Sequence, residues 1–373
     1  MDPGEESPSA EESPNPALPS DRAGRLARLL AVLRGAAAAD GRRLLLLTHR
    51  SPDPDALGAL VGLDHLLRRT LGLDPVIATG GRIFRAENMA MVRELELAFE
   101  DYEALEPTRF WGVIVVDAQP TFGHTVLPAE VPVLAVFDHH EPQGSAPAGE
   151  VPHADVRLGI GATSSIVYEY LTAAKIDLDH RVATALCCGI RFDTADLSLK
   201  ITALDEEAFF ECFRRADRRM LARITQPSLP PTYYRELHRS LSRARKHGPL
   251  VFGLLGRVKD PESVAEMADF FLRLEGAGWS LVGGEFEGVY HLSLRTDPRF
   301  GRAFSLLERV LDGEGSFGGR GTVAGGQIPL ESGDEQTLAR LERRLRARAL
   351  GMVDAALLGA SDPRRGTRLT RLP

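Results

Sequence analysis

The sequence is poor in three features that mark particular classes of protein. Cysteine occurs only at Cys187, Cys188 and Cys212, with no C-x-x-C pair, so a disulfide scaffold is not expected and a reducing compartment fits better. The N-terminus lacks a basic start followed by an apolar core, so no signal peptide is expected. Apolar runs are far shorter than the roughly 20 residues that cross a bilayer. We therefore expect a cytoplasmic protein with no membrane partner.

An excess of basic residues is also missing. Lys and Arg total 45 against 52 Asp and Glu, a formal net charge of -7. Proteins that bind duplex DNA usually carry a strongly basic surface, so duplex DNA is not an expected partner. A short anionic ligand held at one local site remains compatible with this charge. The chain has 373 residues, 43% of them hydrophobic, which is enough for two domains of ordinary size.

Changes in composition along the chain divide it into five segments. The first is rich in Pro, Glu and Ser and has almost no large apolar groups, so it cannot offset its ordering entropy by burial. The last contains many Arg residues and is expected to fray. A glycine-rich stretch near the end of the fourth segment is interpreted as a loop. The expected segments are a disordered tail (1–22), a first domain (23–225), a linker with a connecting helix (226–247), a second domain (248–350, with the glycine-rich stretch at 313–326) and a C-terminal tail (351–373).

Short apolar runs alternate with helical patterns in both expected domains. Fully apolar runs are typical of parallel strands that are buried on both faces, and a strand–helix alternation implies a doubly wound α/β domain with a mostly parallel sheet. A smaller α/β domain is expected to follow it. The predicted strands are Leu44–Leu47, Val113–Val116, Val133–Phe137, Leu250–Leu255, 280–286 and 289–295, and the predicted helices are 56–71, 161–174, 180–190, 261–276 and 300–311.

Acidic and histidine residues recur at the carboxyl ends of these apolar elements. In open α/β sheets, ligands bind in the crevice beyond the carboxyl ends of the strands, so these side chains are expected to converge. Taken singly, Asp117 is typical of a strand-end cap and Asp193 of a helix cap, and only the set as a whole indicates a site. The members are His49, Asp53 and Asp55 after the first run, Asp117 after the second, Asp138, His139 and His140 after the third, and Asp193 in the segment Gly189–Thr194.

Four carboxylates in one crevice repel one another, because like charges raise each other's pKa. Two divalent cations would relieve this repulsion. Oxygen and imidazole ligands without a thiolate suit Mn²⁺ or Mg²⁺ better than structural zinc. Two such cations, roughly 3.5–4 Å apart, polarise a phosphoryl group and activate water for attack on phosphorus. The residues therefore indicate hydrolysis of a phosphoester without a covalent intermediate.

The same segments resemble the motifs of a known family. HRSPDPDALGA at 49–59, the isolated Asp117, DHH at 138–140 and GIRFDT at 189–194 are similar to the four motifs of the DHH phosphoesterase superfamily. The C-terminal unit resembles the companion DHHA1 domain, because SLRT at 293–296 and GGRGTVAGG at 318–326 are similar to its substrate-contacting segment and glycine-rich loop. The branch of nanoRNases and pAp phosphatases (bifunctional oligoribonucleases) is the most similar. The fold that this implies has its active site in the cleft between the two domains.

The resemblance implies a role for each residue of the set. Asp117 would bridge the two cations, and Asp138 would orient an imidazole while His140 contacts the scissile phosphate. Substrate phosphates or a terminal nucleotide would be bound by Arg295 and by the backbone amides of the glycine-rich segment. One cation would be held by His49, Asp53 and Asp117, and the other by Asp55, Asp117, His139 and Asp193; the expected catalytic residues are Asp138, His139 and His140, and the expected substrate-binding residues are His140, Arg295, Gly318, Gly319, Arg320 and Gly325.

Two positions depart from the family pattern. Arg320 stands where the family usually has His, and it can bind phosphate but cannot act as a pH-responsive donor. The DHH motif is followed by residues 141–144, EPQG, which differ from the usual run of the branch.

The expected function is hydrolysis of short oligoribonucleotides to mononucleotides with two divalent cations, Mn²⁺ or alternatively Mg²⁺. Small nucleotides, with 3'-phosphoadenosine 5'-phosphate (pAp) among them, are further expected substrates. Alternatives are linear or cyclic dinucleotides, inorganic polyphosphate, or a regulatory module that binds nucleotides with a weakened active site. A homodimer is left open beside a monomer.

Overall fold

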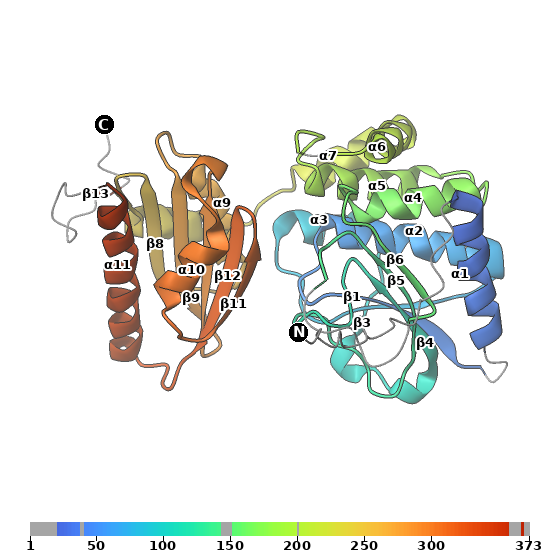
Figure 1. The fold of residues 1–373 in the computed structure, drawn as a ribbon, viewed down its shortest axis with the longest axis horizontal. Coiled ribbons are helices and arrows are strands. Elements are labelled where there is room, and N and C mark those ends of the chain that lie inside the picture. Colours follow the sequence, from blue (N-terminus) through green and yellow to red (C-terminus); the bar gives the residue numbers. More distant parts are fainter. Residues whose placement is uncertain (1–20, 38–40, 143–150, 200, 358–366, 369–373) are drawn as a thin grey trace, which may run out of the picture. The chain divides into compact units, whose positions relative to one another are not determined.

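A computed structural model describes residues 21–37, 41–142, 151–199, 201–357 and 367–368 of the chain. These form two compact units, unit 1 (Met1–Pro227) and unit 2 (Ser228–Pro373) (Figure 1). Nearly all of the expected tail at 1–22 lies outside the described residues. Within the described ranges, no helix has the length and apolarity that crossing a bilayer requires.

Unit 1 is built on a six-stranded sheet with the order β3-β2-β1-β4-β5-β6, in which all neighbouring strands are parallel. This order and direction confirm the expected doubly wound α/β fold, and the strand order reverses between β1 and β4. The strands are β1 (Arg43–Thr48), β2 (Val76–Thr79), β3 (Glu100–Asp101), β4 (Phe110–Val116), β5 (Val133–Asp138) and β6 (His153–Val156).

The two faces of this sheet are covered differently. Leu44 and Leu46 of β1 pack into a large core formed with the helices, whereas Leu45 and Leu47 face a smaller core that is closed by connecting segments, including Phe122. In Figure 1 the helices gather on one side of the sheet. They are α1 (Arg22–Ala36), α2 (Pro54–Leu71), α4 (Thr163–Ala173) and α5 (His180–Asp193), with α3 (Ala86–Glu94), α6 (Ala203–Arg215) and α7 (Arg218–Thr225) around them and the short turns η1 (Tyr102–Ala104) and η2 (Pro107–Arg109) on the connections.

Unit 2 is a seven-stranded mixed sheet with the order β11-β12-β10-β9-β8-β7-β13. Only β8 and β9 pair in parallel, and the other described pairs are antiparallel. Two helices pack on each face, α8 and α9 on one and α10 and α11 on the other. The elements are α8 (Pro231–Arg243), β7 (Arg245–His247), β8 (Leu250–Arg257), α9 (Glu262–Leu272), β9 (Trp279–Phe286), β10 (Val289–Thr296), η3 (Pro298–Phe300), α10 (Ala303–Leu311), β11 (Ser316–Arg320), β12 (Val323–Pro329), α11 (Glu335–Leu357) and β13 (Thr367–Arg368).

Two expectations for unit 2 were wrong. The stretch 313–326 is not a loop, because β11 and β12 form a hairpin that turns at Gly321, whose φ is +55°. Glycine is disfavoured in strands, yet here pairing with β10 overrides that preference. The C-terminal tail does not begin at residue 351, because α11 continues to Leu357 with Val353 buried.

Candidate metal centre

The expected site residues of unit 1 meet at the carboxyl edge of its sheet. His49 directly follows β1, Asp117 directly follows β4, and His139 directly follows β5. Asp193 is the last residue of α5, which packs against α2. The strand order reverses between β1 and β4, so the cluster occupies the position where open α/β sheets bind ligands.

Three groups of ligand atoms lie at this edge, the atoms of each within 4.8 Å of one another, and two of these groups share no residue. The first group is His49, Asp53 and Asp117, and Nε2 of His49 lies 3.7 Å from Oδ2 of Asp117. The second is Asp55, His139 and Asp193, and Nε2 of His139 lies 2.9 Å from Oδ2 of Asp193. Each of these two groups offers carboxylate oxygens and one imidazole nitrogen, a donor set that suits Mn²⁺ or Mg²⁺.

Asp117 connects these two groups, and together with His139 and His140 it forms the third. Its Oδ2 faces His49, while its Oδ1 lies 3.8 Å from Nε2 of His139 and accepts a hydrogen bond of 2.8 Å from the Thr163 hydroxyl. The backbone of Asp117 has φ of +54°, a left-handed conformation that non-glycine residues adopt at a cost and mostly at functional positions. Its carboxylate is thereby presented to both groups at once.

Unsatisfied atoms in this cluster indicate that something else binds there. Oδ2 of Asp117 and Nε2 of His139 are both buried and make no hydrogen bond among the described residues, and their close neighbours, Nε2 of His49 and Oδ2 of Asp193, are themselves candidate ligand atoms. Buried polar atoms are nearly always paired, and an unpaired one is expensive. A cation bound between these atoms would satisfy both, so the residues fit the two divalent cations that the sequence led us to expect.

The imidazole of His139 is oriented by its other nitrogen. Nδ1 lies 3.2 Å from the backbone carbonyl oxygen of Ile160 and donates to it, which leaves Nε2 as the ligand atom. A carbonyl partner of this kind is the usual way in which proteins fix the tautomer of a metal-binding histidine.

Asp55 is held from the opposite side by the first turn of α4. Its Oδ2 accepts 2.6 Å from the backbone N–H of Thr163 and its Oδ1 accepts 2.8 Å from that of Ser164. A helix N-terminus favours a carboxylate through its unpaired N–H groups and its dipole. Asp53 similarly caps α2, accepting from the N–H groups of Asp55 and Ala56.

Helix α5 approaches Asp55 closely enough to require glycine. A methyl group at Gly189 would lie 2.3 Å from Oγ of Ser164 and 2.9 Å from Oδ1 of Asp55. Gly189 precedes Asp193 by one helical turn, so the close approach and the carboxylate share one face of α5.

Asp138 and His140 form a pair beside the ligand groups. Asp138 is fully buried, and its Oδ1 accepts 2.8 Å from Nδ1 of His140, whose side chain is 41% exposed. Gln119 donates from Nε2 to Oδ2 of Asp138 at 2.6 Å and to the carbonyl oxygen of His140 at 2.9 Å. The pair therefore holds an accessible imidazole in one orientation.

Sequence reasoning gave no role to four residues that support this site. Gln119 fixes Asp138, Thr163 and Ser164 hold Asp55 and Asp117, and Nδ2 of Asn88 donates 2.9 Å to the carbonyl oxygen of Pro52 in the first motif. The start of a predicted helix near residue 161 was the available signal for the α4 contacts. Nothing local marks Gln119 or Asn88, because their partners are distant in sequence.

The proton affinities of the cluster follow from its crowding. Burial, and then the charges of Asp193 and Asp117, raise the pKa of Asp53 to about 7, and burial foremost raises the pKa of Asp55. Burial alone would lower the pKa of His139, but Asp193 and the other carboxylates raise it to about 11. Burial would raise the pKa of Asp117, yet His49 and its neighbours lower it overall. Without a cation, the cluster therefore retains protons near neutral pH.

Unit 2 brings most of its expected substrate-binding residues to one face of its sheet. Ser293 pairs with Gly325 and Gly325 with Gly318, while Arg295 and Arg320 are both opposite Val323 in the register. Residues directly opposite one another share a face. The guanidinium of Arg295 is held by Asp269 of α9 and donates 2.7 Å to Oγ of Ser293.

Gly319 differs from the other glycines of the hairpin. A methyl group there would lie 2.5 Å from Cα of Ala324, which belongs to the core beneath α10 and α11. Gly318 has open space at the same position of its Cβ. Gly319 is thus needed for packing, whereas Gly318 lies on the open face.

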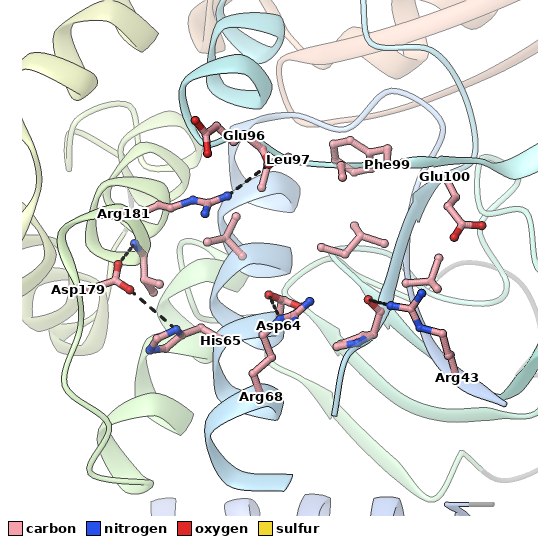
Figure 2. A pocket seen from close by; sticks show the side chains of 16 residues that line it. Arg43, Asp64, His65, Arg68, Glu96, Leu97, Phe99, Glu100, Asp179 and Arg181 are labelled. Atoms are coloured by element: carbon pink, nitrogen blue, oxygen red, sulfur yellow. Dashed lines mark hydrogen bonds and ion pairs between the residues drawn. The ribbon is translucent and has the colours of Figure 1, made fainter. Parts of the chain in front are cut away.

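A separate cavity of about 490 Å³ lies at the other edge of the unit 1 sheet (Figure 2). Its lining includes Arg43 at the start of β1, His65 and Arg68 of the second half of α2, and Arg181 near the start of α5. None of the ligand groups described above lines it. The metal centre and this cavity are therefore distinct features of unit 1.

The fold and the site together define a class of protein. It is a parallel α/β domain with a candidate two-cation centre at the point where the strand order reverses. Residues 43–190 match the model of the DHH family, N-terminal domain, so this part of the chain is similar to that family. The match covers the first three ligand clusters and ends three residues before Asp193.

Two further proteins are similar to the chain. An uncharacterized protein of Methanocaldococcus jannaschii is 30% identical over 317 residues, which are 83% of this chain and 64% of that protein. The chain thus spans less than two thirds of that relative's length. The crystal structure of an exopolyphosphatase-related protein from Bacteroides fragilis superimposes with a TM-score of 0.65, covering 86% of this chain and 95% of that one at 15% identity. At this identity, the likeness shows a shared fold.

Proposed function

We propose that the chain is a phosphoesterase that uses two divalent cations, Mn²⁺ in preference to Mg²⁺, to hydrolyse short oligoribonucleotides to mononucleotides. The observation that carries this proposal is the pair of ligand groups joined by Asp117, with buried ligand atoms that make no hydrogen bond among the described residues. The similarity of residues 43–190 to the DHH family supports the same class of chemistry.

Different residues of unit 1 would bind the two cations and contact the phosphoryl group. His49, Asp53 and Asp117 would hold one cation, and Asp55, Asp117, His139 and Asp193 the other. Bound there, the cations would neutralise the carboxylates, polarise the phosphoryl oxygens and lower the pKa of water. His140, accessible and held by Asp138, would donate a hydrogen bond to the phosphoryl group undergoing attack. Ile160 keeps His139 in the tautomer that binds the metal.

Recognition of the rest of the substrate is assigned to unit 2. Arg295, fixed by Asp269 and Ser293, offers a pre-oriented guanidinium, the group that binds phosphate in bidentate fashion. Gly318 and Gly325 leave the adjoining strand backbone uncovered by side chains on that face. We propose that these groups bind further phosphates or a terminal nucleotide, and that pAp is a second substrate.

A panel of substrates tests the proposal. The full chain, loaded with Mn²⁺, is incubated with RNA of two to five nucleotides, pAp, linear and cyclic dinucleotides, pyrophosphate and polyphosphate. Release of mononucleotides from short RNA supports the proposal. Cleavage of the inorganic substrates or cyclic dinucleotides alone would replace the substrate assignment, and no cleavage of any substrate with bound Mn²⁺ would leave a regulatory module.

Asp117→Ala tests the shared ligand. It should abolish turnover, because Asp117 belongs to the first group and its Oδ1 lies 3.8 Å from Nε2 of His139 in the second. The matched control is Asp177→Ala, which should keep full activity because the Asp177 side chain is 88% exposed. Retained turnover in Asp117→Ala would contradict the bridging assignment.

A further inference from the structure

A second pocket of unit 1 is lined by residues that are sequence neighbours of the proposed metal ligands. It has a volume of about 290 Å³, and its lining includes Pro54, Arg85, Glu87, Cys188 and Phe192. Pro54 stands between Asp53 and Asp55, and Phe192 precedes Asp193 in α5. Consecutive Cα atoms are about 3.8 Å apart, so two walls of the pocket are one residue away from three of the proposed metal ligands.

The most unusual member of the lining is Phe192. Its side chain is 40% exposed, although it sits on a helix whose other apolar residues are mostly buried. The guanidinium of Arg85 lies over its ring, 5.6 Å from the ring centroid. An exposed ring and a guanidinium plane are the two surfaces on which proteins stack nucleobases.

The remaining walls suit a flat heterocycle with a polar edge. Pro54, Cys188, Ala195 and Ile224 supply apolar surface. Glu87 supplies an acceptor, since its Oε2 is buried and accepts no hydrogen bond among the described residues, its ion pair with Nε of Arg85 being 3.9 Å long. A buried acceptor without a donor is unfavourable, and the amino group or ring N–H of a base would satisfy it.

We propose that this pocket binds the nucleobase of the nucleotide whose phosphate lies at the metal centre, with Phe192 as the stacking surface and Glu87 as the acceptor for a base N–H group. The inference rests on the proposed function for the identity of the reacting phosphate. It adds that the substrate must carry a base, which inorganic pyrophosphate and polyphosphate lack.

Binding of AMP and of ribose 5-phosphate to the Mn²⁺-loaded full chain, measured by isothermal titration calorimetry, tests the pocket. Both ligands carry a ribose with a 5'-phosphate, and at C1 AMP has adenine where ribose 5-phosphate has a hydroxyl group. AMP should bind about 5- to 150-fold more tightly, the range that stacking of one base on an aromatic side chain gives. Phe192→Ala should reduce this ratio to near one without changing the affinity for ribose 5-phosphate, whereas Phe192→Trp should keep it.

Two controls keep the outcome interpretable. Phe210→Ala removes a 50% exposed aromatic residue of α6 that does not line the pocket, and it should leave the ratio unchanged. Mn²⁺ binding isotherms of each variant report whether Asp193 still binds the metal. If Phe192→Ala no longer binds Mn²⁺, the test is made with Phe192→Leu and Glu87→Gln instead. Glu87→Gln should lower the affinity for AMP alone.

The inference and the proposed function can fail separately. Equal affinity of the unaltered protein for AMP and ribose 5-phosphate, or a ratio that survives every pocket variant, would overturn the nucleobase pocket even if short RNA is hydrolysed. A ratio that depends on Phe192 would uphold the pocket even if no substrate of the panel is cleaved.

Discussion

Nε2 of His139 lies 2.9 Å from Oδ2 of Asp193, joining the carboxyl end of β5 to the last residue of α5. Asp55 completes the group from the start of α2. The nitrogen that faces Asp193 is the one left by the hydrogen bond of Nδ1 to Ile160. In the absence of a cation, this contact is an ion pair, because the surrounding carboxylates raise the pKa of His139 to about 11. A cation that binds here must replace the proton of that imidazole.

Binding of Mn²⁺ should therefore release protons at neutral pH. His139 has a folded pKa of about 11, above its ordinary value of 6.5, so at neutral pH it carries a proton that the cation displaces into the buffer. We expect the apparent affinity to rise with pH, by about tenfold per pH unit for each proton released. Calorimetry in buffers of different ionisation enthalpy measures the number of protons, and an enthalpy that does not depend on the buffer would contradict the ion pair.

Asp53→Asn should stabilise the protein in the absence of metal while preventing stabilisation by metal. The pKa of Asp53 is raised to about 7, so the folded state holds its proton more tightly than the unfolded state, and stability falls as pH rises from about 4 to 7. Asparagine removes the charge and keeps the helix cap, since Asn and Asp cap equally well.

Thermal unfolding at pH 8 with EDTA checks this prediction. The variant should melt about 2–4 °C above the unaltered protein, the shift that about 1 kcal/mol produces in a domain of this size. Saturating Mn²⁺, which should add about 2.7 kcal/mol at 100 times its Kd, should stabilise only the unaltered protein. A lower melting temperature for Asp53→Asn in EDTA would show that the charge of Asp53 does not destabilise the folded protein.

Gly189→Ala should disturb the second ligand group from within the helix packing. The added methyl group would meet Oγ of Ser164 and Oδ1 of Asp55, and overpacking of this kind costs about 1–3 kcal/mol. We expect weaker Mn²⁺ binding together with lower stability in urea unfolding. Gly35→Ala is the matched control, because nothing lies within 4 Å of its Cβ and α1 should become slightly more stable. Equal behaviour of the two variants would rule out the close approach.

Gln119 should control turnover without controlling metal content. Replacement by Leu removes the hydrogen bond from Gln119 to the buried carboxylate of Asp138 and leaves the one from His140. Changes to residues that orient an active-site group typically reduce activity about 10- to 100-fold. Gln119→Glu should be worse, since it sets one carboxylate against another. The comparison of kcat on short RNA with Mn²⁺ isotherms separates the effects, and loss of Mn²⁺ in Gln119→Leu would assign Gln119 to the metal site itself.

The sequence predicted the parts of the molecule in which local pattern and structure agree. Leu44–Leu47 and Val113–Val116 are fully apolar runs, and such runs are buried strands in a parallel sheet. The ligands could then be placed, because each follows the carboxyl end of a predicted element. The grouping of His49 with Asp117 and of His139 with Asp193 came from family resemblance, and the structure brings these atoms together.

The parts that sequence did not reveal depend on tertiary contacts. Gln119 and Asn88 have no local pattern, since Asp138 and Pro52 reach them only through folding. The hairpin of β11 and β12 was mistaken for a loop because glycine weakens an isolated strand, while here β10 supplies the pairing edge. The pocket at Phe192 was equally hidden, because its walls come from separate helices and loops.

The most direct test of the central claim is electron paramagnetic resonance of the chain titrated with Mn²⁺. If Asp117 bridges two cations, two equivalents of Mn²⁺ should bind and give the spectrum of an exchange-coupled pair, and Asp117→Ala should remove the coupling. One Mn²⁺ per chain at saturation, or two that give only the spectrum of isolated ions, would contradict a shared centre built on Asp117.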